Sequence, residues 1–309
     1  MLLYFVLCSQ IICLKSPENI FITRTSDTPL FFVSPTLEKK TAGNCDLFML
    51  ADKPGIQLAL KERRSGNILG FEVIPTTDKK QSDWKELLEN TSAHSKLLRN
   101  FEFLKVTIGI MSSEFTLVPE ALYKPGDENI YFKKNYSTLL NTNVKAQHIS
   151  PLHLYTIFGI ENDLEKELNH LFQDPQLWHY SQALLSGIGM KMKADAGKLL
   201  WLNIRSNKID IVVSENKKLL LLNSFSFKTN EDILYYTLFV CEQLELNPEK
   251  IPMTVTGDIE DHSILYQLLN QYIRNISIPE EPTLGSFSFT ENDLPFHHYA
   301  MLYNLATCE

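Results

Sequence analysis

The same order of predicted strands and helices occurs twice along this chain, and this duplication is the strongest constraint on its fold. Residues 199–276 predict three consecutive strands, a helix, a fourth strand and a second helix. Residues 45–111 repeat most of that order. In both stretches short turns separate apolar runs, which is typical of antiparallel strands joined in a meander. The duplication therefore predicts an α/β protein with two lobes that face each other across a cleft.

Each predicted meander is followed by a helix. The first meander consists of the runs LFMLA, IQLALKE and ILGFEVI, and the second of LLWLNI, IDIVVSE and LLLLNSFSF. Apolar residues at helical spacing predict one helix after the first meander: Trp84, Leu87, Leu88, Leu97 and Leu98. After the second, Thr229 and Asn230 are favoured N-caps, and Glu231 and Asp232 add negative charge that suits a helix N-terminus.

The remaining segments give weaker signals. The expected elements are a strand at 103–111, a helix around 128–140, the apolar run LHLYTIFGI, a helix at 161–172, a strand with the sequence PMTVTGDI, a helix at 262–276 and a short strand before a closing helix near 296–306. The glycines and lysines of GIGMKMKADAG suggest a hinge between the halves. We therefore expect an irregular leader or over-extended start at 1–44, an N-terminal lobe at 45–196 and a C-terminal lobe with a closing helix at 197–309.

Composition excludes several classes of function. A formal net charge of -8 disfavours nucleic-acid binding, which depends on clustered Lys and Arg. The five cysteines are scattered, with no C-x-x-C pair, as is typical of reduced cytosolic thiols rather than disulfides or a zinc site.

The first thirteen residues, MLLYFVLCSQIIC, are apolar but too short to span a bilayer, and no positively charged segment precedes them. They represent an over-extended start, a weak export signal or an added edge strand, and we favour the first or third. We expect a cytoplasmic protein without a membrane anchor.

Three segments of the second half resemble a known family: GKLLWLNIRSNKIDIVVSENKKLLLLNSFSFKTNEDILYYTLFVCEQL, PMTVTGDIED and LPFHHYAMLYNLATCE. They are similar to a Bacteroidetes family of proteins of unknown function with an actin-like ATPase fold. The duplicated order also resembles the ribonuclease-H-like halves of actin-like ATPases, including the pilus-assembly PilM group. The resemblance covers residues 45–309 and is strongest from Gly197. It implies a duplicated ribonuclease-H-like fold with mixed five-stranded sheets, and the family itself has no assigned activity.

The resemblance also indicates where a nucleotide would bind. Actin-like ATPases hold phosphates with two hairpin loops, which need close backbone N–H groups and a carboxylate for the hydrated cation. Asp52 and Gly55 stand at the first matching hairpin, but Lys53-Pro54 replaces the small residues and proline removes an N–H donor. The second matching loop, 203–208, has neither a carboxylate nor a glycine. Gly257 and Asp258 stand where a later glycine pair is expected.

Asp52, Gly55, Gly257 and Asp258 are thus weak candidates for cofactor binding, and ordinary turn chemistry explains each of them as well. Gly187-Ile188-Gly189 lacks the third glycine of a dinucleotide fingerprint. Two histidine pairs could ligate a metal, His148 with His153 and His297 with His298, but no carboxylate or thiol at a recognised spacing joins them. We therefore expect no catalytic residue, no metal site and no cofactor.

Three functions remain open. The first is a non-catalytic actin-like scaffold that binds a protein or peptide in its cleft or along an exposed sheet edge. The second is a divergent ATP-binding enzyme or switch, in which Asp52 and Asp258 supply carboxylates and Arg205, Lys208 or Lys53 neutralises phosphate. The third is a membrane-associated assembly factor resembling PilM. The incomplete phosphate loops favour the first function and a protein that is not an enzyme.

Overall fold

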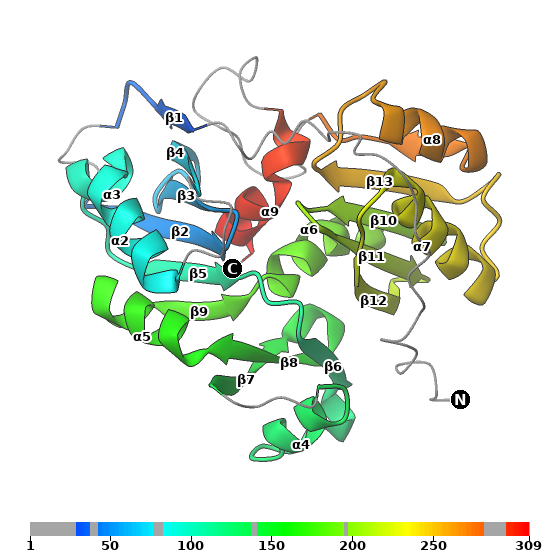
Figure 1. Ribbon diagram of the computed structural model, residues 1–309, viewed down its shortest axis with the longest axis horizontal. Coiled ribbons are helices and arrows are strands. Elements are labelled where there is room, and N and C mark those ends of the chain that lie inside the picture. Colours follow the sequence, from blue (N-terminus) through cyan, green and yellow to red (C-terminus); the bar gives the residue numbers. More distant parts are fainter. Residues whose placement is uncertain are drawn as a thin grey trace.

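Two sheets with the same strand arrangement form the centres of two lobes, as Figure 1 shows. The computed structural model describes residues 29–37, 43–76, 83–136, 141–194, 197–280 and 295–308. The apolar residues 1–13 and the short strand expected before the closing helix lie outside these ranges. Among the described helices, none is both long and apolar enough to cross a membrane.

The first sheet has the strand order β1-β4-β3-β2-β5-β9. Its strands are β1 (Leu30–Val33), β2 (Cys45–Asp52), β3 (Gly55–Glu62), β4 (Ile68–Pro75), β5 (Val106–Ile110) and β9 (Gln176–His179). The predicted meander β2-β3-β4 is antiparallel, and β5 and β9 continue from β2 in parallel. The four strands predicted for this sheet are present, β9 was not predicted, and β1 adds a sixth strand within the segment expected to be an irregular leader.

The second sheet repeats this arrangement with the order β12-β11-β10-β13-β14. Its strands are β10 (Leu199–Ile204), β11 (Lys208–Glu215), β12 (Lys218–Ser226), β13 (Pro252–Gly257) and β14 (Asn275–Ser277). The meander β10-β11-β12 is again antiparallel, and β13 and β14 are parallel to β10. The predicted duplicated ribonuclease-H-like topology is therefore confirmed, because the two sheets share one order and one set of directions.

Helices cover both sheets (Figure 1). In the first lobe they are α2 (Trp84–His94), α3 (Lys96–Asn100), α5 (Asn162–Leu171) and α6 (Ser181–Ala194), and in the second α7 (Asn230–Gln243) and α8 (Ile264–Tyr272). A capping box between Thr229 and Asp232 starts α7, as the sequence indicated. The closing helix α9 (Phe296–Thr307) contacts α6, strands β2 and β3 of the first sheet, and β13 of the second.

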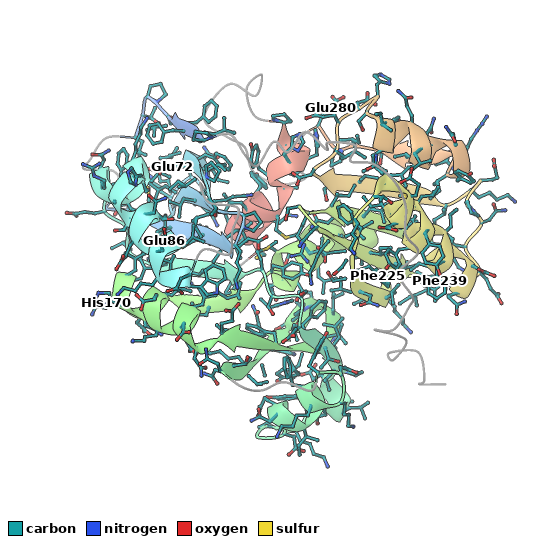
Figure 2. All side chains as sticks on the ribbon, in the orientation of Figure 1. Glu72, Glu86, His170, Phe225, Phe239 and Glu280 are labelled. Atoms are coloured by element: carbon teal, nitrogen blue, oxygen red, sulfur yellow. The ribbon has the colours of Figure 1, made fainter. Side chains whose placement is uncertain are left out.

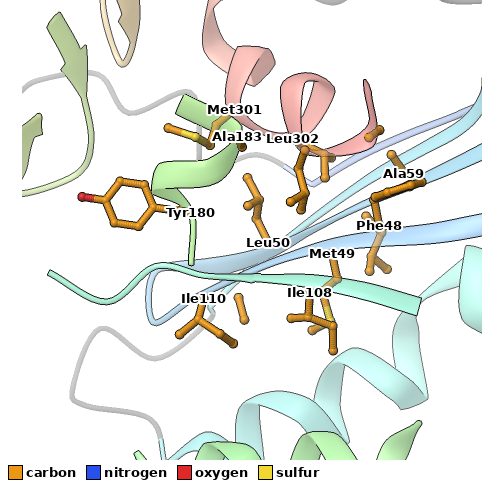
Figure 3. Close-up of a cluster of buried hydrophobic side chains, with 14 of the residues drawn as sticks. Phe48, Met49, Leu50, Ala59, Ile108, Ile110, Tyr180, Ala183, Met301 and Leu302 are labelled. Atoms are coloured by element: carbon orange, nitrogen blue, oxygen red, sulfur yellow. The ribbon is translucent and has the colours of Figure 1, made fainter. Parts of the chain in front are cut away.

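The core of the first lobe has two apolar layers, one on each face of the sheet. Figure 3 shows Leu50 directed toward Met301 and Leu302 of α9, while Met49 and Ile108 lie on the opposite face. All five side chains are less than one-tenth exposed. Because α9 supplies one of these layers, the end of the chain completes the core of the first lobe.

The prediction of a single helix after the first meander is wrong, since the chain forms two helices, α2 and α3, with a break at Ser95. The hydroxyl of Ser95 accepts the N–H of Leu98 and donates to Glu72 Oε2 at 2.7 Å. The carboxylate of Glu72 also accepts the N–H groups of Lys96 and Leu97. A buried anion therefore binds the N-terminus of α3, which periodicity cannot reveal.

A third sheet, with the order β6-β8-β7, is inserted between β5 and β9. Its elements are β6 (Phe115–Pro119), α4 (Glu128–Lys133), β7 (Thr142–Ile149) and β8 (Leu154–Glu161). The apolar run LHLYTIFGI, which the sequence analysis noted without assigning an element type, contains most of β8, and β6 and β7 were not predicted. Most side chains of β7 are polar and only partly buried, so this strand lacks the apolar alternation that would identify it.

The predicted hinge at 187–197 is wrong for residues 187–194, because these residues belong to α6. Gly187 lies within this helix at a point where α9 approaches closely. A Cβ at Gly187 would lie 2.1 Å from Nδ2 of Asn304 in α9. The glycine therefore permits close helix packing rather than bending of the backbone.

Candidate functional site

A small cavity between the lobes brings together all four cofactor-binding candidates of the sequence. The β2–β3 hairpin contributes Asp52 and Gly55, and the chain after β13 contributes Gly257 and Asp258. The β10–β11 hairpin closes the other side with Arg205. The cavity volume is about 80 Å³. A ligand site for a drug-sized molecule usually has about 300–1,000 Å³, so this space does not accommodate a nucleoside triphosphate in the observed arrangement.

The surrounding backbone explains why glycine occurs at both candidate positions. Gly257 has φ +88°, and a Cβ there would lie 1.9 Å from the carbonyl oxygen of Ile204. A Cβ on Gly55 would lie 2.8 Å from the carbonyl oxygen of Ile74 in the neighbouring strand. Glycine is required at both positions by strand packing, so neither residue by itself indicates a phosphate.

Asp52 lies half-buried at the end of β2, where its Oδ1 accepts the N–H of Lys53 at 2.8 Å. Burial raises the pKa of Asp52, and the positive charge of Arg205 opposes this effect. The ammonium of Lys53 instead pairs with Glu161 at 3.4 Å and lies over the ring of Trp84. Lys53 is therefore not among the residues that line the cavity.

Arg205 forms a buried ion pair that sequence reasoning missed. Its Nη2 donates to Asp210 Oδ1 at 2.9 Å and to the hydroxyls of Tyr180 and Ser224. The side chain of Asp210 is 0% exposed and that of Arg205 is 10% exposed. The carboxylate of Asp210, which stands between the apolar residues Ile209 and Ile211, was the available signal, because a buried charge needs a partner.

Tyr180 connects this ion pair to the first lobe. Its hydroxyl donates to Asp210 Oδ1 at 2.8 Å, and burial raises its pKa, so the phenol stays protonated. The guanidinium of Arg205 lies 4.5 Å from the centre of the Tyr180 ring. Figure 3 shows the Tyr180 hydroxyl pointing away from the apolar cluster of the first lobe. One residue of each lobe therefore binds the same carboxylate.

The second carboxylate oxygen of Asp210 accepts a hydrogen bond that belongs to a chain of side-chain hydrogen bonds within the second sheet. Asn203 donates to Oδ2 of Asp210 at 3.0 Å, and the hydroxyl of Thr256 donates to the amide oxygen of Asn203 at 3.2 Å. Nε1 of Trp201 donates to the Thr256 hydroxyl at 3.1 Å. Because both carboxylate oxygens have protein donors, Asp210 has little capacity left for a hydrated cation.

A larger groove lies between the inserted sheet and the second lobe, with a volume of about 520 Å³. Its walls come from the edge strand β6 with residues 134–136 and from the edge strand β12 with α7. Leu220, Leu221, Phe225 and Phe239 form its apolar side. Lys208 also lines this groove and donates to the Ser113 hydroxyl, so it lies outside the set that lines the small cavity.

The structure joins each predicted histidine pair to a glutamate. His148 and His153 approach Glu120 with distances of 3.5 and 2.9 Å, and His153 is 83% exposed. His297 and His298 meet Glu260, with 2.8 Å between His298 Nε2 and Glu260 Oε1. Neither glutamate is at a recognised sequence spacing from its histidines, so the sequence could not assign these groups.

Comparison with known proteins identifies both family and fold. A family profile described as "Protein of unknown function (DUF3822)" matches residues 34–276. No curated protein matches this chain. A crystal structure from Bacteroides thetaiotaomicron, of a protein with an actin-like ATPase fold and unknown function, is similar with a TM-score of 0.75 and 23% identity, covering 89% of this chain and 100% of the other.

A second similar structure is a PilM-PilN type IV pilus biogenesis complex, with a TM-score of 0.60, 11% identity and coverage of 85% of this chain and 97% of the other. These similarities confirm the predicted actin-like fold. At this level of identity they establish the fold alone.

Proposed function

The chain belongs to the DUF3822 family of proteins of unknown function, and we propose that it is a non-catalytic actin-like scaffold that binds an extended segment of a protein partner along β12. The observation that carries this proposal is the contrast between the two spaces beside the second lobe. The small cavity at the expected nucleotide position has about 80 Å³ and is lined by Arg205, which is paired with Asp210, whereas the groove beside β12 has about 520 Å³.

The residues that line the small cavity argue against phosphate transfer there. The second hairpin directs a guanidinium, already bound to Asp210, toward the space where an ATPase needs backbone N–H groups and a metal-binding carboxylate. Opening the cavity for a triphosphate would expose or break a buried ion pair. Breaking such a pair typically costs about 3–5 kcal/mol, so the ligand would first have to offset that cost.

The groove has the features that strand addition requires. β12 is the outermost strand of the second sheet, and within the described ranges no strand pairs with its outer side. Its partly buried apolar side chains and those of α7 form one wall, and Figure 2 labels Phe225 and Phe239 on these two elements. A free edge supplies main-chain hydrogen bonds, and apolar pockets select alternate side chains of an added strand.

The opposite wall is less suited to pairing. The hydroxyl of Tyr136 accepts the N–H of Phe115 and donates to its carbonyl oxygen, so this part of β6 is already satisfied. An added strand is therefore expected to bond to β12 and to contact β6 through side chains. Lys134 and Lys208 line the groove beside the single acidic residue Glu114, which favours a segment with apolar residues and one acidic residue.

Selection of random twelve-residue peptides on the full chain would test this function. Peptides that bind should be rich in β-branched and aromatic residues, and Phe239→Glu should weaken them at least about tenfold, as fluorescence anisotropy would measure. Tyr272→Glu is the matched control, since Tyr272 is an aromatic residue of α8, 49% exposed and not part of the groove. Equal affinities of Phe239→Glu and the unchanged protein would contradict the proposal.

The convergence of Asp52, Gly55, Gly257 and Asp258 on one cavity favours a second candidate, a divergent ATP-binding switch. Thermal unfolding with millimolar ATP, ADP or GTP and Mg²⁺ distinguishes the two candidates, because a bound ligand raises the midpoint by mass action. We expect no shift with any nucleotide. Magnesium-dependent ATP hydrolysis that is lost in Asp52→Ala would favour the switch.

A further inference from the structure

Glu260, His297 and His298 come together where the closing helix meets the second lobe. Glu260 follows β13, and the two histidines lie in the first turn of α9. One ligand atom from each residue lies within 4.8 Å of the other two. Among the described residues, no other group of three histidine, cysteine or acidic side chains has its ligand atoms this close together.

The hydrogen bonds leave a metal-binding nitrogen available on His297. Its Nε2 lies 2.9 Å from the carbonyl oxygen of Ile259. A carbonyl oxygen can only accept a hydrogen bond, so Nε2 carries the proton and Nδ1 carries the lone pair. Histidines that bind metals usually donate their second ring nitrogen to a carbonyl or carboxylate in this way, which fixes the ring and the tautomer.

The other two side chains have complementary environments. The side chain of His298 is 3% exposed, and its ring centre lies 4.1 Å from that of His297. Glu260 is 51% exposed, so an ion can reach the group from solvent.

We propose that Glu260, His297 and His298 form a binding site for a divalent transition-metal ion of the zinc class. Two imidazole nitrogens and one carboxylate oxygen are a known set of zinc ligands, and imidazole ligands disfavour Mg²⁺ and Ca²⁺. Three protein ligands leave one position of a tetrahedral ion for water. The ion connects the loop after β13 to α9, which packs on β2 and β3, and so links the two lobes.

The test uses the purified full chain, dialysed against a chelator and then titrated with ZnCl₂ by calorimetry. We expect one zinc ion per chain and a higher thermal midpoint when zinc is present. Glu260→Gln and His298→Gln should each weaken binding at least about tenfold. Cobalt(II) substituted for zinc should give the intense visible absorption of a tetrahedral site, and this absorption should be lost in both variants.

Glu120→Gln supplies a matched control, because Glu120 also meets two histidines, His148 and His153, but on the exposed inserted sheet. It should bind zinc as tightly as the unchanged protein. The proposal is wrong if zinc binds equally to Glu260→Gln and the unchanged protein, or if Glu120→Gln abolishes the binding. Glu260 is half-exposed, so its variant should fold, and circular dichroism would verify this. The result is independent of the peptide experiment.

Discussion

The two lobes share one strand order but differ in the hairpin that each presents to the other. The first-lobe hairpin has an acidic residue, Asp52, at the end of β2 and a glycine, Gly55, at the start of β3. The second-lobe hairpin presents Arg205, whose guanidinium is bound by Asp210 of β11. The apolar strands maintain the duplicated topology, whereas the loop residues determine what the space between the lobes can bind. A shared fold therefore does not by itself determine the chemistry of the cleft.

The lobes also differ in where their charges lie. In the first lobe Arg63 binds Asp46 at 2.8 Å, but the side chain of Arg63 is 50% exposed. In the second lobe the Arg205–Asp210 pair is almost completely buried. Solvent can replace the partner of an exposed arginine, but not that of a buried one. The structure of the cleft should therefore depend far more on the second-lobe pair.

The largest expected effect follows from removing the buried carboxylate. Asp210→Ala leaves the guanidinium of Arg205 without its charged partner, and we expect a loss of about 3–5 kcal/mol in the free energy of unfolding. Asp46→Ala in the first lobe should cost about 1–2 kcal/mol, since Arg63 can be solvated. Urea unfolding followed by tryptophan fluorescence measures both. Equal losses would remove the proposed difference between the lobes.

A smaller effect is expected from glycines in corresponding strands. Gly257→Ala should cost about 3 kcal/mol, because it combines a positive φ with overlap against the carbonyl of Ile204. In Gly109→Ala the added Cβ would meet the side-chain ends of Leu50 and Leu305, at 2.6 and 3.1 Å. Side-chain ends can shift, so we expect about 1–2 kcal/mol. Thermal unfolding of both variants would show whether contact with backbone atoms makes Gly257 less tolerant of substitution than Gly109.

The smallest effect concerns the carboxylate of the first-lobe hairpin. Burial raises the pKa of Asp52 above 3.8, so the stability it contributes is present below that pH and is lost as the pH rises through the folded-state pKa. Asp52→Asn should therefore raise the free energy of unfolding at pH 7, by less than about 1 kcal/mol, and the gain should shrink as the pH falls. Urea unfolding between pH 4.5 and 7.5 measures it. A destabilised variant at pH 7 would indicate that the charge of Asp52 is needed in the folded protein.

Local patterns predicted much of the fold. The turns between apolar runs identified both meanders, and the N-caps identified the start of α7. Strand β7 of the inserted sheet was not predicted because it is mostly polar. The break at Ser95 was not predicted because its cause, Glu72, lies far away in the sequence, in β4. The candidate residues were predicted individually, but their convergence on one small cavity required the packed lobes.

The sequence by itself determined the duplicated topology and the family, because strand period, turn residues and apolar runs act over short distances along the chain. Only the tertiary structure decided which charges meet. The Tyr180–Asp210 hydrogen bond and the meeting of Glu260 with His298 each join residues that are far apart in sequence. Such contacts follow from the packing of whole elements, and no local pattern records them. The chemistry between the lobes is therefore a property of that packing.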